Sequence, residues 1–190
     1  MQLEMKVIVA LWGLLAVVWG TTALYDTKPT VKAQSSGSRI VQTALLGCGF
    51  FLLYRTSIGV EWLDKPIILQ PGWIPWIGVS IAFLGVAFAI WARTLLGSNW
   101  SGTAKLKAGH TLIRGGPYRI VRHPIYTGIL VAALGTAVVG DSLHALLAVP
   151  FCILSYWLKI RTEESLLISQ FGRDYLDYRH RVKALIPYLL

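Results

Sequence analysis

RHPIYTGILVAALGTAVVGDSLHALLAVPFCILSYWLKIRTEE, residues 122–164, is the stretch that decides the fold. It holds two apolar segments, residues 125–140 and 143–160, separated only by Asp141-Ser142. Because this spacing leaves little room for a loop, we predict a helical hairpin. Charged and hydrogen-bonding residues lie at both ends, at 122–126 and at Glu163-Glu164. A hairpin returns to the side on which it began, so both clusters are expected at one membrane face, where they would form a polar pocket at the edge of a bilayer.

The composition is that of a membrane protein. Hydrophobic residues make up 55% of the 190 and charged residues 14%, outside the range of ordinary soluble domains. Apolar runs lie at residues 5–24, 40–60, 73–96, 125–140 and 143–160. About 20 apolar residues cross a bilayer, so the short fourth run leaves tilting, local thinning and incomplete crossing open. The first run lacks a convincing small-x-small cleavage site, and we interpret it as a retained helix rather than a signal peptide.

The basic residues predict how the protein is oriented. Most of the 18 Lys and Arg residues fall within residues 26–39, 93–123 and 159–190. The positive-inside rule places these segments in the cytoplasm, with the N-terminus outside, the C-terminus inside and the site on the cytoplasmic face. Arg55 lies near the outer end of its helix, where it is expected to snorkel. The net charge of +9 is therefore a topology signal, and we expect no nucleic-acid partner because no basic cluster lies on a soluble domain.

We expect one integral membrane domain, residues 1–190, because nothing between the helices is long enough to fold alone. Residues 1–97 would contain three transmembrane helices, and residues 98–190 a cofactor-binding loop, the hairpin and a C-terminal helix. A stripe spaced by four and three predicts that the last helix is amphipathic and cytoplasmic. Gly172 is expected to break or kink it. The stripe consists of Glu164, Ile168, Phe171, Tyr175, Tyr178 and Val182. The fold class is thus all-α, with about five transmembrane helices.

The start of the hairpin has features of an anion-binding site. Pro124 suits the first turn of a helix and keeps His123 extended just outside it. The free N–H groups of that turn, beside Arg122 and His123, favour an anion. Tyr126 lies in the same turn, so its ring and hydroxyl are expected to line the same cavity. An interfacial belt of Arg, His and Tyr is the structural alternative.

The two glutamates cannot form a close acid/base dyad, because adjacent helical residues point about 100° apart. At most one faces the pocket squarely, and the other reaches its rim or a base such as Lys159 or Arg161. A solvated face beside Arg161 is the alternative. The four histidines show no metal-ligand spacing, so no metal is expected.

These residues together resemble a known family, the isoprenylcysteine carboxyl methyltransferases and their phospholipid methyltransferase relatives. Those are multi-pass membrane enzymes that use S-adenosylmethionine. The matching pattern covers roughly the second half of the chain, and its joint spacing is specific although each piece alone is weak. It consists of H-T-L-I at 110–113, G-P-Y at 116–118, R-H-P-I-Y at 122–126, E-E at 163–164 and F-G-x-x-Y-x-x-Y at 171–178.

The resemblance implies an S-adenosylmethionine pocket formed by the loop before the fourth helix, the R-H-P-x-Y turn and the E-E helix. The implied cofactor contacts are His110, Thr111, Leu112, Ile113, Tyr118, His123, Pro124, Ile125, Tyr126, Glu163 and Glu164, with Thr103 as a further candidate. Arg122, His123 and Arg161 are the implied catalytic residues. The family has a basic residue four positions before the first glutamate that helps to bind the substrate carboxylate. That position is Lys159 here, and lysine lacks the planar fork suited to a carboxylate. Either Arg161 replaces it in substrate binding, or the substrate differs.

The resulting hypothesis is an S-adenosylmethionine-dependent methyltransferase at the membrane interface. Its acceptor would be the carboxyl group of a C-terminal isoprenylated cysteine or a similar lipidic molecule. Phospholipid N-methylation and a non-catalytic lipid-binding scaffold are the alternatives. A carboxylate acceptor is already an anion and needs only a cation to hold it, whereas an amine must lose a proton, for example to Glu164 or His123. The expected partners are the bilayer and a lipidic or prenylated substrate.

Overall fold

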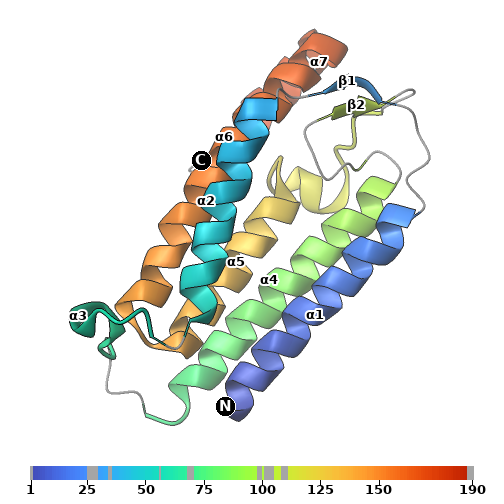
Figure 1. Cartoon of the computed structure of the whole chain (residues 1–190). Coiled ribbons are helices and arrows are strands. Elements are labelled where there is room, and N and C mark those ends of the chain that lie inside the picture. The colour runs from blue at the N-terminus through green and yellow to red at the C-terminus, as the bar shows by residue number, and fades with distance from the viewer. Residues whose placement is uncertain are drawn as a thin grey trace.

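The protein folds into a bundle of long helices, seen here in a computed structural model. The structure describes residues 2–24, 30–33, 36–55, 57–67, 71–97, 100, 105–107 and 111–187. Helices α1 and α4 lie side by side on one flank and α2 and α6 on the other, with α5 between them (Figure 1). The elements are α1 (Leu3–Leu24), β1 (Thr30–Ala33), α2 (Ser36–Tyr54), α3 (Glu61–Asp64), α4 (Ile74–Leu96), β2 (Lys105–Lys107), the 3-10 helix η2 (Gly116–Arg119), α5 (Pro124–Gly140), α6 (Leu143–Phe171) and α7 (Arg173–Arg181).

The predicted all-α membrane fold is confirmed. Four of the described helices, α1, α2, α4 and α6, are long and apolar enough to cross a membrane. The fifth apolar helix, α5, is shorter at 17 residues, so the crossing of five helices stays a prediction. The hairpin of α5 and α6 turns tightly, because Asp141 adopts a left-handed φ of 44°. The Ser142 hydroxyl then accepts a hydrogen bond of 3.3 Å from the Ala145 amide and caps α6.

Two helix ends differ from the predicted ones. Helix α2 ends at Tyr54 rather than near residue 60, because the carboxylate of Asp64 accepts hydrogen bonds from Ser57 (2.6 Å) and the Ile58 amide (3.0 Å) and folds this segment into a turn. Helix α6 continues to Phe171, so the two glutamates lie inside it and not beyond its end. Gly172 then ends α6 with a φ of 52°, which confirms the predicted break.

A two-stranded antiparallel sheet adds to the helical fold. Strand β1 pairs with β2, and the pair lies at the end of the bundle that also carries α7 (Figure 1). The sequence did not predict it, because strands of four and three residues are too short to show an alternating pattern.

Glycines allow α4 and α5 to approach backbone to backbone. Gly78 and Gly85 of α4 face Gly135 and Gly128 of α5. A Cβ atom on Gly85 would lie 2.5 Å from the Gly128 carbonyl oxygen, closer than packed atoms approach. Small residues at such contacts are typical of helix packing in membranes, where the lipid provides no hydrophobic drive between helices. The two helices therefore form one rigid pair that fixes where α5 begins.

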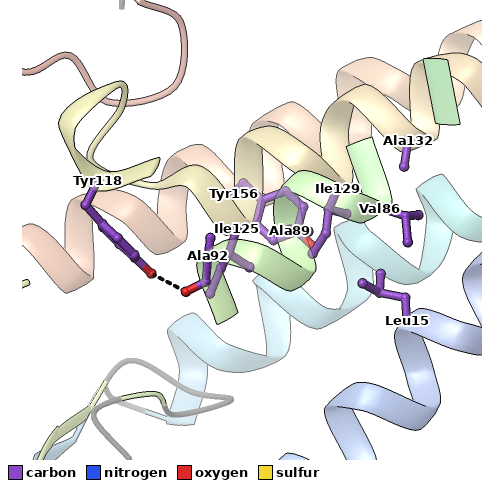
Figure 2. Packing of buried hydrophobic residues seen from close by; sticks show 9 residues of the cluster. All are labelled: Leu15, Val86, Ala89, Ala92, Tyr118, Ile125, Ile129, Ala132 and Tyr156. Carbon is purple, nitrogen blue, oxygen red and sulfur yellow. Dashed lines mark hydrogen bonds between the residues drawn. The ribbon is translucent and has the colours of Figure 1, made fainter. Parts of the chain in front are cut away.

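The core beside this pair consists mainly of small and branched side chains. Val86, Ala89 and Ala92 of α4 pack with Ile125, Ile129 and Ala132 of α5, together with Leu15, Tyr118 and Tyr156 (Figure 2). At one end of this cluster, the hydroxyl of Tyr118 donates a long hydrogen bond of 3.4 Å to the Ala92 carbonyl. The core thus anchors η2, and with it the segment leading to α5, on the last turns of α4.

Candidate active site

The turn that enters α5 is held by the last residues of the described chain. Pro124 is the first residue of the helix and His123 lies just outside it, as predicted. His123 is not in the predicted extended conformation, because its φ of −121° is combined with a ψ of 59°. The amides of Arg122 and His123 donate to the carbonyls of Lys183 (2.7 Å) and Ala184 (3.0 Å). A hydrogen bond from the Thr127 hydroxyl to the Leu185 carbonyl (2.8 Å) extends this pairing. The two amides before the helix therefore hold the chain end and are not directed at a ligand.

Glu164 lies in a buried ion cluster. Its Oε1 accepts hydrogen bonds from Nε (2.8 Å) and Nη2 (2.6 Å) of Arg122, and the two side chains are 8% and 9% exposed. The Nε2 of His123 lies 3.3 Å from the same oxygen, and Arg179 Nε lies 3.4 Å from Oε2. Arg122 also donates to the carbonyls of Arg179 and Val182. These contacts favour a role in joining the turn to α6 and α7 over the predicted direct cofactor contact of Glu164.

Glu163 contacts the same turn but stays more open. The Tyr126 hydroxyl donates a hydrogen bond of 2.6 Å to its Oε1, and His123 Nδ1 lies 3.7 Å from its Oε2. The His123 ring thus lies between the two carboxylates. Both glutamates contact the turn, Glu163 through Tyr126 and Glu164 through Arg122. The reason is that the R-H-P-I-Y turn passes across α6, so side chains about 100° apart reach different residues of it.

A cavity of about 330 Å³ lies beside this cluster, between α1, α2, α5 and α6. Tyr126 lines it and stacks on Tyr156, with ring centroids 4.7 Å apart. Lys159 also lines it, with Nζ 5.2 Å from the centroid of the Tyr126 ring. Arg161 is exposed and lies over the Trp157 ring at 5.2 Å instead. The structure therefore brings Lys159 to the site and does not bring Arg161 there.

The loop before α5 is only partly placed near the site. Thr111 is exposed, Leu112 and Ile113 are half-buried, and Tyr118 is buried. Tyr178 of α7 donates a hydrogen bond of 2.6 Å to the Tyr118 carbonyl. Burial raises the pKa of both the Tyr118 and Tyr178 hydroxyls, so both act as neutral donors. His110 and Thr103 lie outside the described residues, and their roles stay predictions.

Arg93 places a positive charge at the site end, the end of the bundle that holds Glu163. From the sequence it was used only to predict the orientation in the membrane. It lies in the last turn of α4 and is 2% exposed. Its guanidinium carbon lies 4.1 Å from the ring centroid of Trp100, a cation–π distance. Trp100 in turn lines the cavity. An arginine within an otherwise apolar helix was the signal that could have identified it, because such a residue in a membrane helix faces the protein interior.

The chemistry of this site fits the cofactor that the resemblance implies. Glu163 offers carboxylate oxygens to hydroxyl and amino groups, and the rings of Tyr156 and Trp100 line the cavity, as aromatic contacts for a purine or a sulfonium cation require. Lys159 offers a positive charge to a carboxylate. Among the described residues, no group of three His, Cys, Asp or Glu side chains is placed to hold a metal, and the absence of a metal stays a prediction.

Comparison with known proteins supports this interpretation. Residues 73–174 match the sequence model of the phospholipid methyltransferase family. Protein-S-isoprenylcysteine O-methyltransferase B of Arabidopsis thaliana is 30% identical over 183 residues, which cover 92% of this chain and 91% of that protein. The Tribolium castaneum protein-S-isoprenylcysteine O-methyltransferase is 32% identical over 136 residues, which cover 68% of this chain and 47% of the relative.

A solved structure supports the same family. It is that of a eukaryotic intramembrane Ras methyltransferase, isoprenylcysteine carboxyl methyltransferase, with a TM-score of 0.52 and 27% identity over 84% of this chain and 55% of that one. The chain spans about half the length of the Tribolium relative and of this structural neighbour. The matches to the Arabidopsis protein and to the family model nonetheless include both the turn at residues 122–126 and Glu163-Glu164. The chain belongs to the isoprenylcysteine carboxyl methyltransferase family.

Proposed function

We propose that this protein is an S-adenosylmethionine-dependent methyltransferase of the membrane interface. Its acceptor would be the C-terminal carboxylate of an isoprenylated cysteine or a similar lipidic molecule, as the names of its relatives suggest. The observation that carries the proposal is the hydrogen bond from Tyr126 to Glu163 (2.6 Å) at the wall of a cavity between apolar helices. It joins the two motifs of the resemblance at a point that both a polar cofactor and a lipid tail could reach.

The proposed chemistry requires alignment more than acid or base catalysis. When bound, S-adenosylmethionine would supply a methyl group on a sulfonium, which a carboxylate oxygen takes by forming an O–C bond as the C–S bond breaks. Glu163 accepts hydrogen bonds from the cofactor's hydroxyl or amino groups, and Tyr126 orients that carboxylate. The aromatic walls exclude water, which strengthens the hold of nearby cations on the acceptor carboxylate. Because that carboxylate is already ionised, no side chain has to remove a proton.

The parts of the chain have separate tasks in this proposal. Residues 98–190 form the catalytic half, and residues 1–97 supply the remaining walls of the cavity. The His123 ring, which lies between the two glutamates, forms part of the pocket wall. Arg122 and Glu164 position the turn rather than touch the reacting atoms, because both side chains are buried and occupied by each other.

We also propose that the site end faces the cytoplasm. That end carries α7 and the β1–β2 pair, and the N-terminus lies at the opposite end of the bundle (Figure 1). The excess of basic residues at the site end supports this orientation. The test uses a Cys48→Ser, Cys152→Ser background with either Gln2→Cys or Asp177→Cys. A membrane-impermeant maleimide applied to intact cells should label residue 2 alone, and labelling of residue 177 alone would reverse the orientation.

Two measurements test the proposed activity. Calorimetry of the purified protein should detect S-adenosylmethionine binding that Glu163→Ala weakens about tenfold or more, whereas Arg55→Ala, at the other end of the bundle, has no effect. Transfer of a tritiated methyl group should occur to N-acetyl-S-farnesylcysteine. Transfer to phosphatidylethanolamine instead would favour the phospholipid reaction. Absence of cofactor binding would exclude both enzyme functions.

A further inference from the structure

The cavity beside Glu163 has a positively charged end built by two helices. Among the described residues that line it, the charged ones are Arg39 of α2 and Lys159 of α6. Both are cations, and the described part of the lining contains no carboxylate. Leu46 and Ile129 belong to the apolar part of the same lining. The cavity therefore suits a ligand with an anionic head and an apolar body.

The two cations lie at the same depth in the bundle. Helices α2 and α6 run in opposite directions and pack together (Figure 1). Near their site end, the Ser155 hydroxyl donates a hydrogen bond of 2.9 Å to the Gln42 carbonyl. Arg39 precedes Gln42 by about one helical turn and Lys159 follows Ser155 by about one turn. Because the helices are antiparallel, both cations are displaced from this bond toward the end that holds Glu163.

The positive end is also next to the proposed methyl-transfer site. Lys159 Nζ lies 5.2 Å from the Tyr126 ring centroid, and the Tyr126 hydroxyl contacts Glu163. An anion between the two cations would therefore lie beside the cofactor pocket. Away from this end, Leu46 lies about two turns beyond Arg39 on α2, and Ile129 lies about one turn beyond Tyr126 on α5. An apolar tail would extend along these side chains.

We propose that Arg39, together with Lys159, binds the carboxylate of the acceptor and makes the enzyme specific for an anionic lipid. This inference rests on the proposed function, because it names the residues that hold that function's substrate. Lysine is a point charge, whereas the arginine guanidinium presents a planar pair of N–H groups that matches a carboxylate. Arg39 supplies from α2 the fork that Lys159, at the position where the resemblance predicts a basic carboxylate ligand, lacks.

A neighbouring hollow gives the apolar tail a route to this position. Arg39 and Thr43 also line a second hollow, on the flank of α2, together with Ile40 and Ala44. Ile40 is 69% exposed, as expected of a side chain that faces lipid. Arg39 thus lies where this flank meets the cavity, and an acceptor arriving from the bilayer would pass it.

The experiment compares two ligands of nearly the same shape, of which one carries a negative charge and the other is neutral. Binding of N-acetyl-S-farnesylcysteine and of its uncharged C-terminal amide is measured on the full chain in nanodiscs, for the wild type, Arg39→Ala, Arg39→Lys and the control Arg55→Ala. The wild type should prefer the acid. Arg39→Ala should weaken binding of the acid about tenfold or more and leave the amide unchanged, whereas Arg39→Lys retains part of the preference. Arg55→Ala, which changes an arginine just beyond the other end of α2, should match the wild type for both ligands.

Kinetic and cofactor measurements separate the possible failures. Arg39→Ala should raise KM for the acid with little change in kcat, and its affinity for S-adenosylmethionine should equal that of the wild type. Equal loss of acid and amide binding would show a structural role and overturn the inference. Normal acid binding and KM in Arg39→Ala would also overturn it while leaving the proposed function intact. A wild type that binds S-adenosylmethionine but neither ligand, and methylates no farnesylcysteine, would overturn the proposed acceptor and this inference together.

Discussion

Arg122 and Glu164 form a buried ion pair in which two guanidinium nitrogens, at 2.8 and 2.6 Å, share one carboxylate oxygen. The pair joins the start of α5 to α6, and Arg179 of α7 lies on the other oxygen. It therefore connects three helices at the point where the proposed cofactor pocket begins. We propose that this pair shapes the pocket and does not contact the ligand directly.

Removing the charge of Glu164 should destabilise the protein strongly. Glu164→Ala leaves Arg122 buried without a counterion, and breaking such a pair costs about 3 to 5 kcal/mol. Thermal unfolding in detergent should show a large fall in Tm. Asp174→Asn is the control, because the Arg114–Asp174 pair is 3.9 Å long with its side chains 45% and 80% exposed, and such surface pairs contribute about 0 to 1 kcal/mol. Similar losses in the two variants would contradict this account.

Tyr126 and Glu163 should act as one unit in cofactor binding. Tyr126→Phe and Glu163→Ala each remove the same hydrogen bond of 2.6 Å, so the double variant should lose less affinity than the sum of the two. We expect a coupling of about 1.5 kcal/mol in the dissociation constant of S-adenosylmethionine. Thr127→Val is the comparison, because its hydroxyl contacts the Leu185 carbonyl and not Glu163. Additive effects of Tyr126→Phe and Glu163→Ala would show that the bond does not orient the carboxylate for the ligand.

A methyl group on Gly85 should separate α4 from α5. Its Cβ would lie 2.5 Å from the Gly128 carbonyl oxygen and from the Ala132 amide nitrogen, and neither backbone atom can move independently. Gly85→Ala is expected to cost about 1 to 3 kcal/mol in unfolding measurements. Gly47→Ala, with nothing within 4 Å of its added Cβ, should be neutral or slightly stabilising, because alanine favours the helix. The prediction fails if Gly85→Ala unfolds with the Tm of the wild type.

Asp64 should make stability depend on acid pH. Hydrogen bonds from the Ser57 hydroxyl and the Ile58 amide lower the pKa of Asp64 below its usual value. A lowered pKa means that the folded state favours the carboxylate, so the stabilisation is complete above the unfolded pKa of about 4 and is lost as the pH falls through the folded pKa. Below about pH 4, the Tm of the wild type should therefore fall more than the Tm of Asp64→Asn. Glu61→Gln, which changes an exposed carboxylate of the same helix, should follow the wild-type profile.

The membrane fold and the pairing of the two motifs were predictable from local pattern. Apolar runs near membrane length identified the long helices, and the two-residue link at Asp141-Ser142 required a hairpin. Proline before residue 125 predicted where α5 begins, and glycine at residue 172 where α6 ends. These signals act within a few residues, so the sequence displays them directly. The short strands and the turn that Asp64 closes over Ser57 were not predictable, because they depend on partners that no periodic pattern marks.

What the sequence by itself determined is the chemistry available at one end of the bundle: an arginine, a histidine, tyrosines, two glutamates and a lysine in place of an arginine. Only the tertiary structure decided which of these residues pair with each other and which lie beside the cavity. It buried Glu164 against Arg122 and left Glu163 beside a cavity, turned Arg161 outward, and brought Arg93 and Arg39, from helices without a recognisable motif, to the site end. The physical reason is that the partner of a charged side chain depends on which helices pack together. That packing is set here by contacts such as Gly85 on Gly128, two residues that lie far from each other along the chain.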